Sequence, residues 1–332
     1  MKFLVVGLGS MGKRRIRNLR ALGHSKIIGV DPREDRRVEA GEKYGVVTYS
    51  SWESAVEKER PDSVVISTSP DLHMHYAERA VARGIHCFVE ASVVEGERIR
   101  ALHKLIVDTR LVVVPSCTMK YFPGPRKVGE LIRSGCIGRP LSLNYLTGQY
   151  LPDWHPWEHI RDYYVSRRET GGAREIVPFE LTWINEIFGD PIALSCVKRK
   201  LTDMEADIDD IYHFHLEYPG RMLASITIDV LSRPRATREF HVFGSEGRLV
   251  FSGEENSVRY IRIGDADWNR TTFGAGTVED GYINPEEPYV SEMNDFVRAV
   301  RESDRTLFPN SLIRDACVLD LLNRIESLDR TT

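Results

Sequence analysis

A glycine-rich loop near the start of the chain has the residue types and the spacing of a phosphate-binding site. Gly7, Gly9 and Gly12 fit the pattern GxGxxG, with Ser10 and Met11 inside it. The first glycine permits a tight turn, the second lets the backbone approach a pyrophosphate, and the third allows close packing of helix on strand. A helix that begins here offers free N–H groups and partial positive charge to phosphates. The loop therefore predicts a bound dinucleotide.

An acidic residue follows this loop at the spacing of a ribose-binding group. Asp31 lies 19 residues after Gly12 and directly follows an apolar run. Its carboxylate would accept hydrogen bonds from the adenosine ribose diol and would repel a 2′-phosphate, so NAD is favoured over NADP. Arg33 is the one nearby feature that favours NADP, because an arginine here can accommodate the 2′-phosphate.

The first 115 residues alternate short apolar runs with helical stretches. Uninterrupted Val, Ile and Leu runs separated by helices are typical of a parallel sheet that is covered on both faces. We expect strands at 3–6, 27–30, 63–66, 86–89 and 111–114, and helices at 11–22, 33–44, 75–83 and 97–109.

The pattern changes after residue 120. Several segments alternate apolar and polar residues, and pairs such as Pro219-Gly220 and Glu246-Gly247 supply turns between them. This favours a mostly antiparallel sheet with one buried face, accompanied by a few helices. We expect strands at 141–149, 192–200, 212–217, 222–230, 238–243, 248–251 and 258–263, and helices at 125–134, 175–188, 289–301 and 310–328.

These elements predict an α/β protein of two domains, which is also what 332 residues favour. The first, residues 1–120, is a doubly wound Rossmann domain that binds NAD. The second, residues 121–332, is an α+β domain on an open, mostly antiparallel sheet, and it would bind substrate and form the oligomer interface.

Charge and cysteine content exclude several classes of protein. With 45 basic and 49 acidic residues the net charge is −4, which argues against nucleic acid or an acidic membrane as a partner. Five cysteines without a CxxC pair argue against a disulfide framework or a structural zinc site. The opening apolar run leads into the glycine loop and is not a signal peptide. Because no run reaches the ~18 apolar residues of a membrane span, we expect a cytoplasmic protein.

Four further segments resemble those of one enzyme family. They are 67–73, which reads Ser-Thr-Ser-Pro-Asp-Leu-His, 88–90, 120–123, and Gly171-Gly172 before a helix. With the loop and helix at 7–22, they make nearly the whole chain similar to the glucose-fructose oxidoreductase, inositol dehydrogenase and MocA family. The resemblance implies oxidation or reduction, with NAD(P), of a hydroxyl on a sugar, sugar nucleotide or cyclitol. It also implies a homodimer or homotetramer formed through the open sheet, whose apolar face would be costly to leave in water.

The same resemblance implies cofactor contacts beyond the glycine loop. Thr68, Pro70 and His73 lie in the segment similar to the family's TPxxxH motif, which lines the cofactor pocket. Glu90 ends the strand that leads into the family's Glu-Lys-Pro motif.

Two residues of the family's usual chemistry are absent. The family's Glu-Lys-Pro reads Glu90-Ala91-Ser92 here, so the lysine beside the reacting hydroxyl is missing. Phe179 stands where the family's helix has histidine, and Glu175 stands where it has aspartate. The resemblance therefore predicts the fold and the cofactor but leaves the acid/base residue open.

Removal of hydride from an alcohol needs a base for the hydroxyl proton. Glu175 is our first candidate, since a buried glutamate with a raised pKa acts near neutral pH; the alternative is a structural ion pair with a neighbouring arginine. Glu180, about 140° around the helix from Glu175, is a second candidate. Lys120 is a third, as a replacement for the missing lysine or simply as a substrate-side or surface cation.

Residues 149–174 are rich in aromatic and basic side chains without a clear period. Aromatic faces pack against sugar rings, and arginines bind phosphates and carboxylates. We therefore expect this loop to bind a sugar phosphate or a nucleotide-sugar, the alternative being contact with a partner subunit. His155 and His159 lack a third ligand, so no metal site is expected. The candidate substrate-binding residues are Trp157, Arg161, Tyr163, Tyr164, Arg168 and Arg174.

Three functions remain open from the sequence. The first is an NAD-dependent oxidoreductase acting on a carbohydrate derivative. The second retains NAD and uses a transient oxidation for epimerisation, elimination or glycoside cleavage. The third is a non-catalytic protein that senses a dinucleotide or a sugar, which the loss of lysine and histidine would suit.

Overall fold

A computed structural model describes residues 1–329, and the chain divides into two compact units. The first unit comprises Met1–Thr118 and Pro285–Cys317. The second comprises Met119–Asn284 and the chain from Val318 onward. The second domain was expected to contain all residues after 120, but Pro285–Cys317 lies in the first unit.

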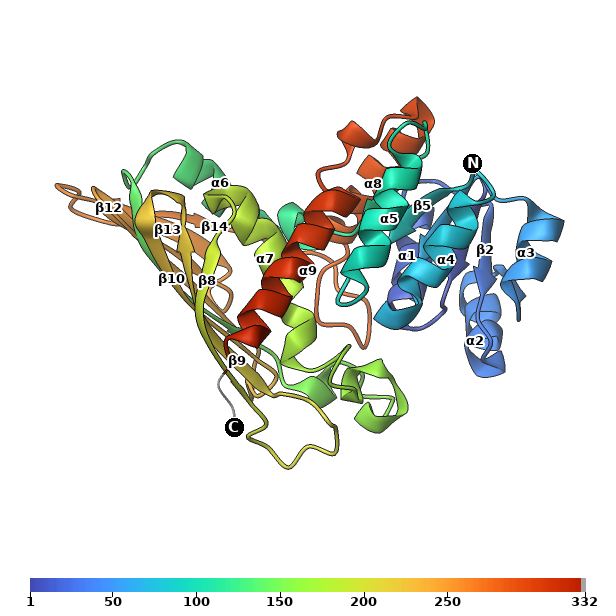
Figure 1. Cartoon of the computed structure of the whole chain (residues 1–332), viewed down its shortest axis with the longest axis horizontal. Coiled ribbons are helices and arrows are strands. Elements are labelled where there is room, and N and C mark those ends of the chain that lie inside the picture. Colours follow the sequence, from blue (N-terminus) through green and yellow to red (C-terminus); the bar gives the residue numbers. More distant parts are fainter. Residues whose placement is uncertain (330–332) are drawn as a thin grey trace. The chain divides into compact units, whose positions relative to one another are not determined.

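The first unit contains a six-stranded parallel sheet with the order β3-β2-β1-β4-β5-β6 (Figure 1). This order reverses direction beside β1, as in a doubly wound dinucleotide-binding sheet, and confirms the predicted fold. β3 was not predicted because its three residues are too few to show a period and none of them is buried. The strands are β1 (Phe3–Val6), β2 (Ile27–Val30), β3 (Val47–Tyr49), β4 (Ser63–Ile66), β5 (His86–Val89) and β6 (Val113–Pro115).

Helices connect these strands, and the predicted helices are present with ends shifted by a few residues. One further helix, α3, went unpredicted although Ser51 caps it by accepting a hydrogen bond from the Ser54 backbone N–H. The helices of this unit are α1 (Ser10–Ala21), α2 (Glu34–Tyr44), α3 (Trp52–Glu59), α4 (His73–Val81), α5 (Gly96–Ile106) and α8 (Glu287–Glu302).

The core of the first unit explains why α8 belongs to it. Phe296 of α8 is fully buried and packs edge-on against Phe88 of β5, with 5.6 Å between ring centroids. Glu292, also fully buried, accepts hydrogen bonds from Ser116 Oγ (2.9 Å) and the Cys117 backbone N–H (2.6 Å). These contacts tie α8 to the residues that follow β6, and such long-range pairing cannot be read from local periodicity.

The second unit is built on an eight-stranded sheet with the order β14-β13-β12-β11-β7-β10-β9-β8. Only β7 and β10 pair in parallel, so the expected mostly antiparallel sheet is confirmed. The short edge strand β14 was not predicted. The strands are β7 (Pro140–Gly148), β8 (Ile192–Arg199), β9 (Ile211–Tyr218), β10 (Met222–Asp229), β11 (Thr237–Gly244), β12 (Gly247–Ser252), β13 (Ser257–Arg262) and β14 (Asn269–Thr272).

One face of this sheet is buried beneath α6 (Pro123–Arg133) and α7 (Ala173–Phe188) (Figure 1). Along β9, buried residues such as Phe214 alternate with exposed ones such as His215, as expected for a sheet with one covered face. The last helix among the described residues is α9 (Leu312–Ser327).

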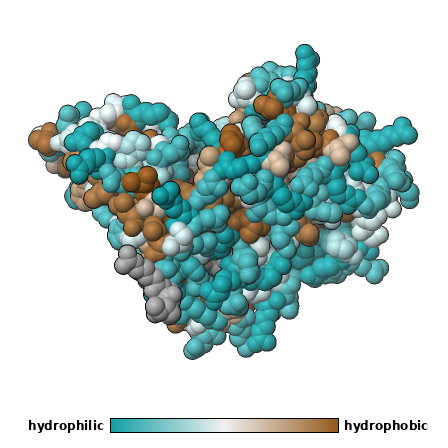
Figure 2. All heavy atoms as spheres, in the orientation of Figure 1, coloured by the Kyte–Doolittle hydropathy of each residue, from teal (hydrophilic) through white to brown (hydrophobic). Residues whose placement is uncertain are grey.

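The surface shown in Figure 2 is mostly hydrophilic, with scattered apolar areas. None of the helices formed by residues 1–329 is long and apolar enough to cross a membrane.

Replacing Phe296 with alanine should destabilise the first unit, because it leaves a cavity against Phe88; we expect a loss of about 3–5 kcal/mol in the free energy of unfolding. Urea unfolding combined with amide hydrogen exchange measures this. Amide protection should fall in β5 and remain in β9. Loss of protection in β9 with β5 unchanged would contradict the assignment of α8 to the first unit.

Candidate functional site

The glycine loop is packed as tightly as the motif requires. Gly7 has φ of +89°, and a Cβ there would lie 2.5 Å from the Ser67 backbone oxygen. A Cβ on Gly12 would lie 1.8 Å from the Gly7 oxygen, so α1 packs directly on the loop. Ser10 and Met11 form the first residues of α1, and Gly9 precedes them without a side-chain cap. No acidic residue lies in the first turn, so this helix N-terminus suits a pyrophosphate.

Asp31 connects the glycine loop to the end of β2. Its Oδ2 accepts a hydrogen bond from the Leu8 backbone N–H (2.8 Å), and its Oδ1 accepts one from the Arg33 backbone N–H (2.9 Å). The residue is buried, and its two oxygens retain further acceptor capacity, as a ribose-binding carboxylate needs.

The cation beside Asp31 is Arg36, which the sequence analysis did not identify. Arg33 instead forms an exposed ion pair with Asp35 at 2.6 Å. Arg36 Nη1 lies 3.9 Å from Asp31 Oδ2 and 3.3 Å from a Cβ built on Gly9. Its place in the first turn of α2 could have identified Arg36, because a long side chain there reaches back to the loop.

The segment after β4 contributes a rigid turn. Pro70 is buried, and Thr68 Oγ1 donates a hydrogen bond to the Ser69 oxygen (3.3 Å). His73 begins α4, and its Nε2 lies 3.1 Å from the Thr68 carbonyl oxygen. Burial lowers the pKa of His73. The imidazole is therefore neutral near pH 7, and it fixes the backbone around Thr68.

Glu90 is held by an arginine inside the first unit. Arg15 donates from Nε to Glu90 Oε1 (2.7 Å) and from Nη2 to Oε2 (2.9 Å), while Ser67 Oγ donates to Oε1 (3.1 Å). Arg15 is fully buried, also pairs with Glu292 (2.9 Å), and lies over the Phe88 ring. Glu90 thus joins a network that links α1, β5 and α8, a role that sequence spacing did not suggest.

Glu175 lies in the first turn of α7 without a counter-charge. Tyr164 donates a hydrogen bond to its Oε1 (2.6 Å), whereas Oε2 contacts neither solvent nor any polar partner among residues 1–329. Burial raises the pKa of Glu175 to about 7, although the bond from Tyr164 acts against this. The ion pair with a neighbouring arginine, which was our alternative, is not formed, because Arg174 pairs with Glu326 (2.8 Å).

Aromatic rings gather in the loop that precedes α7. Tyr163 stacks on His155 (4.6 Å between centroids), which in turn stacks on Trp157 (5.2 Å). Trp157 is half exposed. The Tyr163 hydroxyl and Trp154 Nε1 are buried polar atoms for which residues 1–329 provide no hydrogen-bond partner. Together with Glu175 Oε2 they are neutral or acidic groups available to a ligand.

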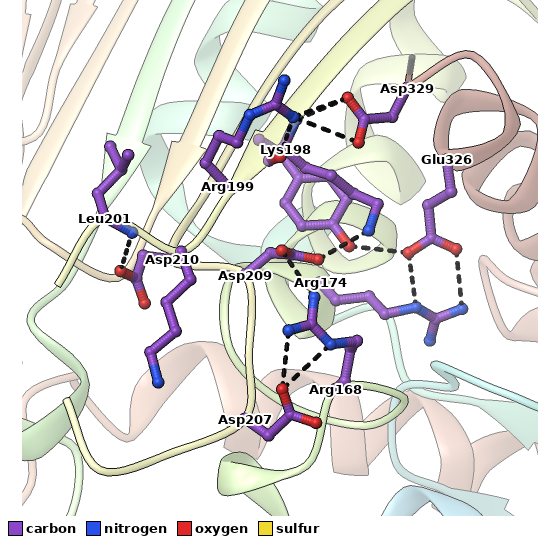
Figure 3. A network of polar contacts seen from close by, with 12 residues as sticks. Arg168, Arg174, Lys198, Arg199, Leu201, Asp207, Asp209, Asp210, Glu326 and Asp329 are labelled. Atoms are coloured by element: carbon purple, nitrogen blue, oxygen red, sulfur yellow. Dashed lines mark hydrogen bonds and ion pairs between the residues drawn. The ribbon is translucent and has the colours of Figure 1, made fainter. Parts of the chain in front are cut away.

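The arginines expected to bind a phosphate are paired with carboxylates. Arg168 contacts Asp207 (2.7 Å) and Asp209 (2.8 Å), and Arg174 contacts Glu326 (Figure 3). Arg161 forms an ion pair with Glu205. The acidic partners lie in the segment 205–209 or in α9, so the positive charge of the loop is largely balanced.

Glu180 is fully committed to the core of the second unit. It accepts hydrogen bonds from Tyr145 (2.7 Å), Trp183 (2.7 Å) and, through both oxygens, Arg238 (2.9 and 2.7 Å). It is fully buried. These four bonds hold the carboxylate in the core, and the Arg238 cation already balances its charge, which is contrary to its candidacy as a base.

Lys120 is also occupied, by an ion pair with Glu186 of α7 that leaves its side chain mostly buried. Ser92, beside the Ala91 that replaces the family's lysine, is buried. Nearby Asp315 is buried as well, and its burial raises its pKa to about 7. Among residues 1–329 no cluster of three His, Cys, Asp or Glu side chains could hold a metal ion.

Two family models match this chain. The oxidoreductase family model with an NAD-binding Rossmann fold matches residues 1–109, and the Gfo/Idh/MocA C-terminal domain model matches residues 126–250. Together they cover well over half of the sequence and fall on the two sheets described above.

Individual proteins agree with these models. Inositol 2-dehydrogenase of Rhizobium meliloti is 22% identical over 317 residues, which cover 91% of this chain and 89% of that protein. D-xylose 1-dehydrogenase [NADP(+)] of Haloarcula marismortui is 23% identical over 216 residues, 61% of this chain and 57% of that protein. The crystal structure of levoglucosan dehydrogenase with NADH and levoglucosan superposes with a TM-score of 0.83 at 18% identity, covering 98% of this chain and 96% of that one. The chain therefore belongs to the Gfo/Idh/MocA family of NAD(P)-dependent oxidoreductases, and its first unit is the NAD-binding Rossmann domain.

Proposed function

We propose that this protein oxidises a secondary hydroxyl of an uncharged sugar or cyclitol with NAD, and that Glu175 is the base. The observation that carries the proposal is the buried Oε2 of Glu175, which has no partner within the described chain and belongs to a carboxyl group with a pKa of about 7. Such a group accepts a proton near neutral pH, as alcohol oxidation requires.

The residues of the first unit that would hold the dinucleotide are the glycine loop and Asp31. Gly7, Gly9 and Gly12 would admit the phosphates to the N-terminus of α1, and Asp31 would accept hydrogen bonds from the ribose diol. When bound, NAD supplies the hydride acceptor. Thr68, Pro70 and His73 form the rigid turn that would border it, while Glu90 supports the loop indirectly through Arg15.

The residues of the second unit have separate tasks. Glu175 takes the hydroxyl proton, and Tyr164 orients the carboxylate through its hydrogen bond. Tyr163 and Trp154 offer unpartnered polar atoms to neighbouring hydroxyls, and the exposed ring of Trp157 offers a face on which a sugar ring packs. These groups suit a neutral polyhydroxylated ligand.

The expectation of a phosphorylated substrate is revised in this proposal. Arg161, Arg168 and Arg174 each already contact a carboxylate, so a phosphate would have to displace an ion pair. The names of the relatives, which concern inositol, xylose and levoglucosan, also point to substrates without phosphate.

With NAD, neutral cyclitols and pyranoses should give steady formation of NADH, and kcat/KM for the corresponding phosphates should be at least about tenfold lower, a difference of ~1.4 kcal/mol. Nicotinamide absorbance measures the rate and NMR identifies the product. A sugar transformed without NADH formation would instead support the NAD-retaining alternative. Dinucleotide binding with every sugar inert would support the sensing alternative.

The activity should depend on pH through Glu175. As a base it must be deprotonated, so kcat/KM for oxidation should rise with pH and level off above about pH 7. Glu175→Gln should abolish this limb and lower kcat by about 10²- to 10⁴-fold. A pH–rate profile that keeps its limb in Glu175→Gln would contradict the assignment.

Tyr164→Phe is a matched variant for the same profile. The lost hydrogen bond stabilises the charged carboxylate, so its removal should move the rising limb to higher pH. A limb that moves to lower pH, or does not move, would mean that Tyr164 does not act on the titrating group.

Asp31→Asn should weaken the preference for NAD over NADP by about tenfold, since it removes the negative charge that opposes a 2′-phosphate while Arg36 remains. The ratio of kcat/KM for the two cofactors measures this. Asp35→Asn is the control, because it removes an exposed negative charge of the same region that pairs with Arg33. Equal changes in both variants would show a general charge effect.

Homo-oligomer formation through the open face of the eight-stranded sheet stays a prediction, as does a cytoplasmic location. Leu146, Leu223 and Phe243 are exposed on strands of that sheet, which is the type of surface that a second subunit would cover.

A further inference from the structure

Arg168, predicted to bind substrate, instead belongs to a network that surrounds Asp209. The carboxylate of Asp209 is mostly buried, and its two oxygens take separate cations. Oδ1 accepts from Arg168 Nη1 (2.8 Å), and Oδ2 accepts from Lys198 Nζ of β8 (2.8 Å). Figure 3 shows Asp209 between these two cations, with Asp207 on the far side of the Arg168 guanidinium.

The backbone around Asp209 forms hydrogen bonds with residues 164–173, the turn that leads into α7. The Asp209 carbonyl accepts a hydrogen bond from the Ala173 N–H (3.2 Å), and the Asp207 N–H donates to the Ser166 oxygen (3.0 Å). Gly172, with φ of +65°, packs so closely on Ile208 that a Cβ there would lie 2.8 Å from the Ile208 Cβ. The segment 207–209 therefore lines the turn along its length.

The turn itself is closed by hydrogen bonds that fix Tyr164. Thr170 Oγ1 donates to the Tyr164 carbonyl (3.0 Å), and the Gly172 N–H donates to the Val165 carbonyl (3.1 Å). Tyr164 and Glu175 come from opposite ends of this turn, and their 2.6 Å hydrogen bond depends on how the turn is held.

We infer that Asp209 is a positioning residue for Glu175. Its side chain forms ion pairs with Arg168 of the turn and with Lys198 of the edge strand β8. Its carbonyl accepts a hydrogen bond from Ala173, the first residue of α7. The consequence is that the Tyr164 hydroxyl is kept on the Glu175 carboxylate. The role of Glu175 as base rests on the proposed function, but its positioning by Asp209 does not.

The groups that could change the pKa of Glu175 are the polar and charged side chains near its carboxylate. Tyr164 contacts the carboxylate, and Tyr163 adjoins it with a hydroxyl whose pKa is raised by burial and then by Glu175 and Glu158. Arg174, next to Glu175 in α7, is directed to Glu326 and to the Glu169 carbonyl. Arg168 itself acts at a distance, through the turn.

The test compares Asp209→Asn with Asp207→Asn. Both variants remove a carboxylate from the same guanidinium, but the Asp207 side chain is 80% exposed and its pair contributes little, whereas that of Asp209 is 7% exposed. The primary measurement needs no substrate. The protonation midpoint of Glu175 is obtained from the pH dependence of unfolding, as the difference between each protein and the same protein with Glu175→Gln.

Asp209→Asn should raise this midpoint by about one pH unit, as loss of a hydrogen bond to the charged form requires. Asp207→Asn should leave it unchanged, and Asp209→Asn should add no further shift in a Tyr164→Phe background. With a sugar that the protein oxidises, Asp209→Asn should also lower kcat by about tenfold. If Asp209→Asn does not fold, Arg168→Ala replaces it, with Arg168→Lys expected to restore part of the shift.

An unchanged midpoint in a destabilised Asp209→Asn protein would overturn the inference and leave Asp209 a structural residue only. Equal shifts in both aspartate variants would also overturn it, since they would come from the charge of Arg168. A shifted midpoint in a protein that oxidises no sugar would support the positioning role and count against the proposed function, so the two failures are distinct.

Discussion

The proposed chemistry depends on a carboxylate oxygen, Glu175 Oε2, that is buried without a cation beside it. The other buried acids of the second unit have more partners. Glu180 pairs with Arg238, Asp209 pairs with Arg168 and Lys198, and Asp210 and Asp229 each accept hydrogen bonds from two backbone N–H groups. Among residues 1–329, Glu175 receives only the Tyr164 hydroxyl. Because transfer of a lone charge out of water is costly, the carboxyl group keeps its proton up to about pH 7. A glutamate in this state can exchange a proton at physiological pH, which is what the proposed role of Glu175 as base requires.

Two arginines near Glu175 in the sequence are kept away from it by ion pairs with other carboxylates. The adjacent Arg174 is drawn to Glu326 of α9, and Arg168 is drawn to the acidic segment 207–209. Each ion pair thus has two effects: it fixes a strand, turn or helix end, and it removes an arginine that would otherwise lower the pKa of Glu175. In the first unit, a buried cation has a structural role. Arg15 lies between Glu90 and Glu292, and its ion pairs join helices α1 and α8 to the sheet.

Local sequence patterns predicted the two sheets, the glycine loop and the acid after β2, because each depends on residues within about one element. Glu175 was singled out because it stands where the family's helix has aspartate, and its role as base stays a proposal. The short edge strands β3 and β14 have too few residues for a period to show. The partners of the arginines could not be predicted, since Asp207 lies 39 residues from Arg168 and Glu326 lies 152 residues from Arg174. For the same reason Glu180 and Lys120 were named as candidate catalytic residues, although Arg238 and Glu186, which are distant in the sequence, pair with them.

The most direct test of the central claim is the titration of Glu175 itself. Carbon-13 NMR of protein labelled at the glutamate side-chain carboxyl, with Glu175→Gln as the reference for assignment, follows the protonation of this one group. The account predicts a resonance that is absent from Glu175→Gln and that titrates near pH 7. A Glu175 resonance that titrates near the ordinary value for glutamate, about 4.3, would contradict it, because the carboxylate would then be charged and solvated and no better suited as a base than any surface glutamate.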